Sequence, residues 1–233
     1  MKTMIKNNPN SAEIIRPIIR GRDIKKYSYS FPGLYLINIP CGYTNSICTS
    51  KNKEQFMSET YPEIFNHFEK YKNVSSSKSK GLLKRDDQGD YWWELRSCVY
   101  LDEFNGQVIA WQRITQENTF CLTEKGTVVL DSMAFLSNTK NNTYYLLGFL
   151  NSTIVYYWMR KNVHEYGSSG FRLSNQYVKE IFVPKDNQLK NDIEKIMNNN
   201  EYTLNEKHKL IDEILFDFYK FTDEEIEIIV NTD

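Results

Sequence analysis

Short apolar runs separated by turn signals fill the middle of the chain and constrain its fold more than any other feature. The runs VIAWQRI and TVVLDS lie between residues 91 and 135, near the dipeptides Asn105-Gly106 and Lys125-Gly126. Asn-Gly and similar pairs adopt the positive φ angles that tight hairpin turns need. Short runs rich in β-branched and aromatic residues are typical of strands. This region therefore predicts an antiparallel or mixed sheet.

Other segments carry a strand pattern or helical spacing. LYLINI, residues 34–39, alternates large apolar residues and predicts a strand. Apolar residues repeat every three or four positions from Tyr61 to Tyr71, which predicts a helix with Pro62 in its first turn. YYLLGFLNSTIVYYWM, residues 144–159, predicts one buried helix, whereas the glycines and serines of HEYGSSGFRLSN predict a loop.

The C-terminal tail has the strongest helix signals. Thr203-x-x-Glu206 and Thr222-x-x-Glu225 are capping boxes, in which each threonine and glutamate caps the other's backbone N–H. Between them, one apolar stripe contains Leu210, Ile211, Ile214, Leu215 and Phe218. The whole pattern predicts an α+β fold, with a β-rich core, embedded helices and a helical C-terminal extension.

Length and composition predict three segments. The 233 residues favour a single core with an appendage. The polar residues 1–12 are expected to be disordered or a linker, residues 13–185 to form the main domain, and residues 186–233 to form the helical extension.

The net charge of −1 averages two unlike parts of the chain. Residues 186–233 hold 5 Lys and Arg against 13 Asp and Glu, a net charge of −8. The rest holds 24 against 17, a net charge of +7. A basic body of this kind is compatible with a nucleic-acid partner.

Several classes of function are disfavoured. The four cysteines, Cys41, Cys48, Cys98 and Cys121, show no metal-ligand spacing, so we expect reduced thiols and no metal site. No apolar run approaches the roughly 18 residues of a membrane span, and no signal-peptide pattern is present, so we expect a cytoplasmic protein without membrane contact. Glycine-rich phosphate loops, nucleophile elbows and metalloprotease motifs are missing, and no catalytic residue is expected. The histidines His67, His164 and His208 are interpreted as surface residues.

Two basic segments are candidate DNA contacts. The GRDIKKY turn carries Arg20, Arg22, Lys25 and Lys26, which could reach phosphates or base edges. A solvated basic turn is an equally good interpretation. Residues 70–85 contain no acidic residue, and this run includes Lys78, Lys80, Lys84 and Arg85. Such a density of cations suits phosphate neutralisation, although a lysine run is more often only an exposed face.

Three further candidates combine aromatic or glycine residues with polar ones. In DDQGDYWWELR a strand would send neighbours to opposite faces, so we expect one tryptophan in the core and Trp92, with Arg96, on the DNA-facing surface. In AWQRITQEN, Gln112 and Arg113 could pair with adenine and guanine, although an ordinary sheet surface explains them nearly as well. The third candidate set follows the glycines of residues 167–170 and comprises Arg172, Asn175 and Gln176.

The order of these blocks resembles the TaqI-like C-terminal specificity domain of type IIG restriction-modification enzymes and adenine-specific DNA methyltransferases. The matching blocks are IIRPIIRGRDIKKY, YLINIP, YPEIFNHFEKYK, LLKRDDQGDYWWELR, VIAWQRI, LLGFLNSTIVYYW and GFRLSNQYVKEIFVP, followed by IDEILFDFYKFTDEEIEIIV. The resemblance covers nearly the whole chain from about residue 13.

The resemblance implies a DNA target-recognition domain of a type II restriction enzyme. Its partners would be double-stranded DNA and methyltransferase and nuclease domains, in the same polypeptide or in a partner subunit. Other domains would flip the target adenine, methylate it and cut the DNA. This chain lacks their motifs, so S-adenosylmethionine and Mg²⁺ are expected in the rest of the enzyme, and no cofactor in this chain.

Three alternatives stay open. A half-length specificity subunit of a type I system would pair with a partner through its acidic C-terminal helices. A diverged methyltransferase or nuclease would bind S-adenosylmethionine by itself. An aromatic-rich protein-interaction domain would show behaviour toward DNA that does not depend on salt.

Overall fold

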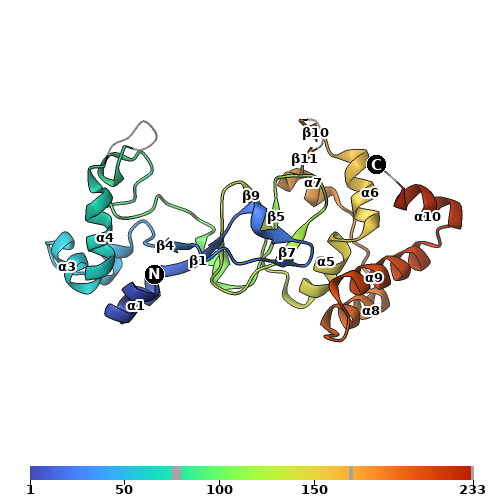
Figure 1. Cartoon of the computed structure of the whole chain (residues 1–233), viewed down its shortest axis with the longest axis horizontal. Coiled ribbons are helices and arrows are strands. Elements are labelled where there is room, and N and C mark those ends of the chain that lie inside the picture. The colour runs from blue at the N-terminus through green and yellow to red at the C-terminus, as the bar shows by residue number, and fades with distance from the viewer. Residues whose placement is uncertain (75–79, 168–169, 232–233) are drawn as a thin grey trace. The chain divides into compact units, whose positions relative to one another are not determined.

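The computed structural model describes residues 1–74, 80–167 and 170–231 (Figure 1). The chain forms two compact units. Unit 1 contains residues 1–18 and 33–102, and unit 2 contains residues 19–32 and 103–233. Helices make up 49% of the described residues and strands 16%, so the expected α+β class is confirmed. The strands are short and the helices predominate, even though β-rich runs dominate the middle of the sequence.

Unit 1 consists of short helices and one strand ladder. Strand β1 (Ile15–Ile19) runs antiparallel to β4 (Tyr35–Ile37). The strand predicted for residues 34–39 is thus present over three residues. Its helices, with η marking 3-10 helices, are α1 (Lys2–Asn7), η1 (Pro9–Ile14), α2 (Tyr43–Ile47), α3 (Lys53–Thr60), α4 (Pro62–Lys72) and η3 (Leu82–Lys84), and η4 (Leu101–Asn105) leads into unit 2.

Helix α4 places aromatic residues in the core of unit 1. It begins at Pro62, as the sequence predicts, and buries Ile64, Phe65 and Phe68. Their packing partners are Ile14, Ile39, Met57, Tyr61, Trp92 and Trp93. The expected disorder of residues 1–12 is wrong, because this segment is helical and docks on the following helices. The Asn7 amide donates to Glu63 Oε1 at 3.2 Å, and the Asn8 amide donates to the Thr60 carbonyl at 3.2 Å.

Unit 2 contains the antiparallel sheets that the sequence predicts. The central strand β5 (Ile109–Gln112) pairs with β7 (Phe120–Leu122) on one side and β9 (Met133–Leu136) on the other. A second sheet has the order β10 (Glu165–Tyr166), β11 (Gly170–Arg172), β6 (Ile114–Thr115). Strands β2 (Ile24–Lys25) and β3 (Ser28–Tyr29) form a small ladder, and β8 (Val128–Val129) follows β7.

Unit 2 also contains helices. They are η2 (Gly21–Asp23), η5 (Lys140–Asn142), α5 (Thr143–Leu150), α6 (Thr153–Asn162), α7 (Asn175–Glu180), α8 (Asn187–Asn198), α9 (Leu204–Tyr219) and α10 (Asp223–Val230). Both predicted capping boxes are present, with Thr203 and Glu206 capping α9 and Thr222 and Glu225 capping α10.

The single helix expected over residues 144–159 is two helices, because Asn151 bonds to a strand. Its side-chain oxygen accepts from Phe120 N at 3.0 Å, and its amide donates to the Phe120 carbonyl at 3.0 Å. The side chain therefore acts as a short strand partner, and Ser152 caps the new helix α6. The expected loop at residues 164–175 is also wrong in part, since Glu165–Tyr166 and Gly170–Arg172 pair as two antiparallel strands.

The C-terminal helices share the core of unit 2. Helix α8 packs against both α5 and α9 (Figure 1). A Cβ at Gly148 in α5 would lie 2.6 Å from Ile193 Cγ2 in α8, so only glycine permits this approach. Ile211 and Leu215 of the predicted stripe are fully buried in the same core. The expected division at residue 186 therefore does not separate two cores. No helix among the described residues is both long and apolar enough to span a bilayer.

Candidate nucleic-acid interface

The segment from Trp111 to Ile114 passes from one sheet of unit 2 to the other. Gln112 ends β5 opposite Met133, and Ile114 begins β6 opposite Arg172. Trp111 is buried, and its indole N–H donates to the Leu173 carbonyl at 2.9 Å. This bond ties the segment to the chain that follows β11, so two segments about 60 residues apart are held together.

These two segments line an open hollow of about 520 Å³, which we call the reading hollow. It is lined by Gln112, Arg113, Ile114, Asp131, Ser132, Arg172, Ser174, Asn175 and Gln176. Five of the residues predicted to bind DNA, Gln112, Arg113, Arg172, Asn175 and Gln176, thus lie at one place. The sequence separates them into two groups, and the β6–β11 pairing brings them together.

The polar groups of the reading hollow are available for a ligand. Arg113, Arg172, Asn175 and Gln176 are exposed and Gln112 is half-buried. Within the described part of the chain, none of these five side chains forms a hydrogen bond or ion pair. Arginine presents a fork of donors, and the amides of Asn and Gln offer a donor and an acceptor side by side. These groups can pair bidentately with guanine and adenine.

A second open hollow of about 760 Å³ adjoins the first, and we call it the turn hollow. Gln112 and Ile114 line both hollows, and Lys25 and Lys26 of the GRDIKKY turn line the second. A Cβ at Gly21 would lie 2.8 Å from Gln112 Cγ and Cδ, so the turn approaches Gln112 closely. The predicted basic turn and the predicted reading segment are therefore neighbours.

The four cations of this turn have different surroundings. Arg20 donates to both carboxylate oxygens of Asp23 at 2.9 Å, and these bonds hold the pKa of Asp23 below its ordinary value. Arg20 is thus occupied in shaping the turn. Arg22 and Lys25 are exposed. Lys26 Nζ lies 3.4 Å from the Asn151 carbonyl, and burial lowers the pKa of its ammonium group.

Behind the turn lies a polar network that reaches helix α9. Tyr27 Oη lies 2.9 Å from His208 Nδ1, and His208 Nε2 lies 3.4 Å from Asp212 Oδ2. Asp212 also accepts from Thr153 N at 2.9 Å. Burial lowers the pKa of His208 and raises that of Tyr27. The interpretation of His208 as a surface residue is therefore wrong, because α9 packs it against the turn.

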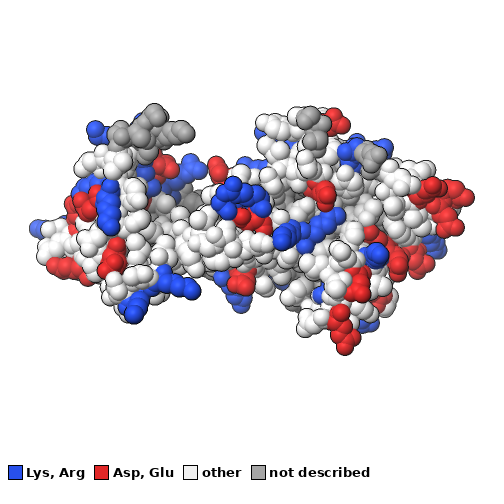
Figure 2. Space-filling model, viewed as in Figure 1, with Lys and Arg blue, Asp and Glu red and all other residues white. Residues whose placement is uncertain are grey.

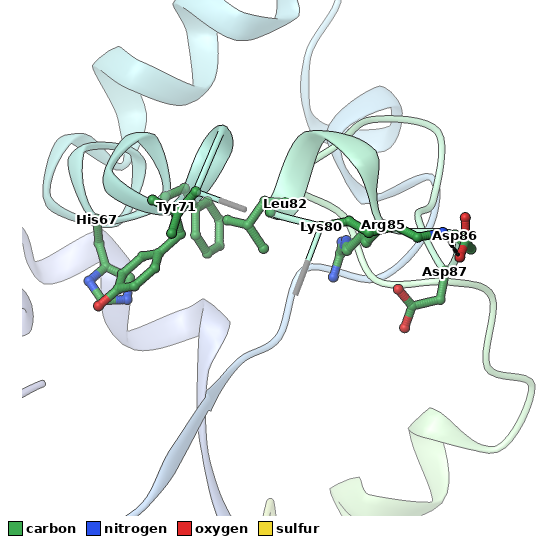
Figure 3. A pocket seen from close by; sticks show the side chains of 10 residues that line it. His67, Tyr71, Lys80, Leu82, Arg85, Asp86 and Asp87 are labelled. Atoms are coloured by element: carbon green, nitrogen blue, oxygen red, sulfur yellow. Dashed lines mark hydrogen bonds and ion pairs between the residues drawn. The ribbon is translucent and has the colours of Figure 1, made fainter. Parts of the chain in front are cut away.

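The lysine run lies in unit 1, next to an open hollow of about 810 Å³ (Figure 3). His67 and Tyr71 of α4 lie side by side there, and Lys80 forms an ion pair of 2.7 Å with Asp86. Lys72 pairs with Glu54 and Glu69, each at 2.8 Å. The charges of Lys72 and Lys80 are thus balanced by acids outside residues 70–85. Lys84 is exposed without an ion-pair partner among the described residues, and Lys78 lies outside them.

The aromatic motif of unit 1 is interior, which corrects the expectation for Trp92. Trp92 and Trp93 are both buried, with 8% and 4% exposure. Their segment is a turn and not a strand, so neighbouring side chains need not point to opposite faces. Arg85 donates to the carbonyls of Trp92 and Glu94 and helps to fix this turn. Arg96 is exposed.

Glu94 lies beside Cys41 and Asp90, a trio whose ligand atoms fall within 4.8 Å of one another. The buried Glu94 carboxylate accepts three backbone N–H groups, from Gly42 at 3.0 Å and from Thr44 and Asp90 at 2.9 Å. Both oxygens are therefore occupied, which makes the trio a poor fit to a cation such as Mg²⁺. Glu94 thus joins the backbone of Gly42 and Thr44 to that of Asp90, and we call this role a loop staple.

Comparison with known protein families shows to which family this chain belongs. The TaqI-like C-terminal specificity domain matches residues 16–183, more than two thirds of the chain. The chain belongs to this family. The solved structures of two restriction-modification enzymes are also similar to this specificity domain. The first is the type IIL enzyme MmeI in complex with DNA, with 14% identity, a TM-score of 0.58 and coverage of 99% of this chain.

The second is the type IIG restriction endonuclease BpuSI, with 13% identity, a TM-score of 0.47 and coverage of 93% of this chain. The specificity domain spans 33% of the MmeI chain and 28% of the BpuSI chain. No curated protein matches it.

The family match ends at residue 183, before the acidic C-terminal tail of the chain. Figure 2 shows carboxylate side chains gathered over α10, where Asp223, Glu224 and Glu225 occupy the first turn. Acidic residues at a helix N-terminus are favourable because they complement the helix dipole. The carboxylates of this turn therefore stabilise α10 itself.

Sequence reasoning missed some residues of the two hollows. Asp131 and Ser132 line the reading hollow, and Glu117 and Tyr166 line the turn hollow. Ile114 lines both hollows. Ile114 and Glu117 lie in the AWQRITQEN block, which also contains the predicted residues Gln112 and Arg113. The other residues have no comparable local signal.

Proposed function

We propose that this specificity domain reads a base sequence in double-stranded DNA as the target-recognition part of a type II, IIG-like restriction-modification enzyme. The observation that carries the proposal is the reading hollow, where five side chains with unused hydrogen-bonding groups converge from two segments. Base edges in the major groove present matching donors and acceptors. Family membership and the fold shared with MmeI support the same assignment.

Cations around the two hollows suit the phosphate backbone. Lys25 is exposed on the turn that lies against Gln112. Phosphate contacts position a protein on a duplex, and base contacts then specify the sequence. We assign Arg22, Arg113 and Arg172 to specific binding, and the lysines near residues 80–84 to general affinity.

Adenine methylation and DNA cleavage would be performed by other domains, in the same polypeptide or in a partner subunit. S-adenosylmethionine and Mg²⁺ would bind there. We infer a cytoplasmic location from a duplex DNA partner and from the four free cysteines.

The alternative of a type I half-subunit that dimerises through the α9 stripe receives less support. Ile211 and Leu215 of that stripe are fully buried in the core of the same chain. They are not available to a second copy while unit 2 is folded.

Selection from a random pool of DNA duplexes tests the proposal. The full chain, incubated at physiological salt, should enrich one sequence motif, because specific sites bind roughly 10³-fold or more above random DNA. R113A and R172A should each lose about 1–3 kcal/mol on the enriched site, since each removes a bidentate contact. K84A should lower the affinity for all duplexes alike and reduce the salt dependence of binding.

K209A serves as the matched control, because Lys209 is an exposed cation on α9 outside both hollows. It should leave the affinity for the enriched site unchanged. A pool without any enriched motif would refute sequence recognition by this chain. If R113A and K84A each lowered the affinity for the enriched site and for random DNA by the same factor, the division between base-reading and phosphate-binding residues would be refuted.

A further inference from the structure

Ile114 is an exposed apolar residue among the polar groups of the reading hollow. Its exposure is 43%, although it lies on a strand between Arg113 and Thr115. It also lines the turn hollow, so it stands where the two hollows meet. An apolar group that covers this side chain would remove its surface from water, which is favourable.

The neighbours of Ile114 leave it open to a ligand. Arg172 lies directly opposite it across the β6–β11 ladder. Gly170 lies two residues before Arg172 on β11, and an added Cβ there would lie 3.9 Å from Ile114 Cγ2. A larger residue at position 170 would contact Ile114, and glycine leaves that side of the isoleucine uncovered.

The chemistry of base edges limits what this side chain can contact. The edges of A·T and G·C pairs in the major groove present hydrogen-bond donors and acceptors and one apolar group, the C5 methyl of thymine. Gln112, Arg113 and Arg172 supply polar groups to the same hollow. An isoleucine among these polar residues can distinguish one base from another only by contacting a methyl group.

We propose that Ile114 contacts the C5 methyl group of a pyrimidine, so that the recognised site contains a thymine, or a 5-methylcytosine, next to bases read by the polar residues. The inference rests on the proposed function and names one base of its target. Ile114 is therefore a specificity-determining residue for this base.

Single replacement of each thymine in the enriched site by deoxyuridine tests the contact, because this removes one methyl group and nothing else. Wild-type protein should lose about fourfold in affinity at one position, the value of burying a methyl-sized group. I114A should bind the unmodified site about fourfold more weakly and should no longer distinguish thymine from deoxyuridine there. I114V keeps methyl groups at the contact and should retain most of the discrimination.

A second series of duplexes, with 5-methylcytosine in place of cytosine, distinguishes a contact with thymine from a contact with 5-methylcytosine. A gain at one cytosine, lost in I114A, would assign the contact to 5-methylcytosine. Because Ile114 is exposed, I114A should keep the wild-type circular dichroism spectrum and melting temperature. Equal responses of wild type and I114A to every methyl change would overturn the contact while leaving sequence recognition intact. A pool without an enriched motif would overturn the proposed function itself, and the contact with it.

Discussion

Replacement of Glu94 by glutamine should loosen the loops of unit 1, because it exchanges an acceptor for a donor at a buried site. Glu94 has 0% exposure and accepts N–H groups from Gly42, Thr44 and Asp90. The glutamine carbonyl can keep the two bonds made by Oε2, but its amide nitrogen then faces Thr44 N–H. One charge-assisted bond, worth about 1.5–3 kcal/mol, is lost, and the Thr44 N–H and the glutamine amide are both left as buried donors without an acceptor.

Relief from burying a charge offsets part of this loss, so we expect a net cost of about 3 kcal/mol. Hydrogen exchange of the Gly42, Thr44 and Asp90 amides measures the effect locally. Since each 1.4 kcal/mol is a factor of ten, these amides should exchange about a hundredfold faster in E94Q.

The matched control is E59Q, at an exposed glutamate of α3 that accepts a hydrogen bond from the Gln55 amide at 2.8 Å. It should change stability by no more than about 0.5 kcal/mol. Unchanged exchange in E94Q would refute the role of Glu94 as a loop staple. Equal acceleration by a chelator on wild-type protein would instead make Glu94 a metal ligand with Cys41 and Asp90.

Two further predictions concern unit 2. G21A should displace the Gln112 side chain, since the added Cβ would lie 2.8 Å from it, and should weaken specific DNA binding as much as Q112A does. Binding measurements on the double variant should show no further loss of affinity. An additive loss would contradict this mechanism. Stability should fall as the pH drops below about 6.5, the ordinary pKa of an unfolded histidine, because burial lowers the pKa of folded His208 and the unfolded chain then binds more protons. Urea unfolding should show a weaker dependence on pH in H208Q, with Asp212, Lys26, Glu117 and Tyr27 still facing the site. H164Q, at an exposed histidine, is the control. An identical pH dependence of wild type and H208Q would show that His208 titrates normally.

The sequence by itself determined the local features of this specificity domain. Helix α4, the two capping boxes of α9 and α10, and the antiparallel strands around VIAWQRI follow from periodicity and from turn or cap residues. These signals act within a few residues, so they can be read along the chain. The candidate residues Gln112, Arg113 and Arg172 also follow from the sequence, because their side chains carry groups that can pair with base edges.

Tertiary structure decided which of these residues meet. The pairing of β6 with β11 gathers Gln112, Arg113 and Arg172 in one hollow, and the bonds of Asn151 to Phe120 divide one apolar segment into two helices. Packing likewise buries Trp92. Such contacts join residues tens of positions apart, and their free energies depend on neighbours that no local pattern specifies.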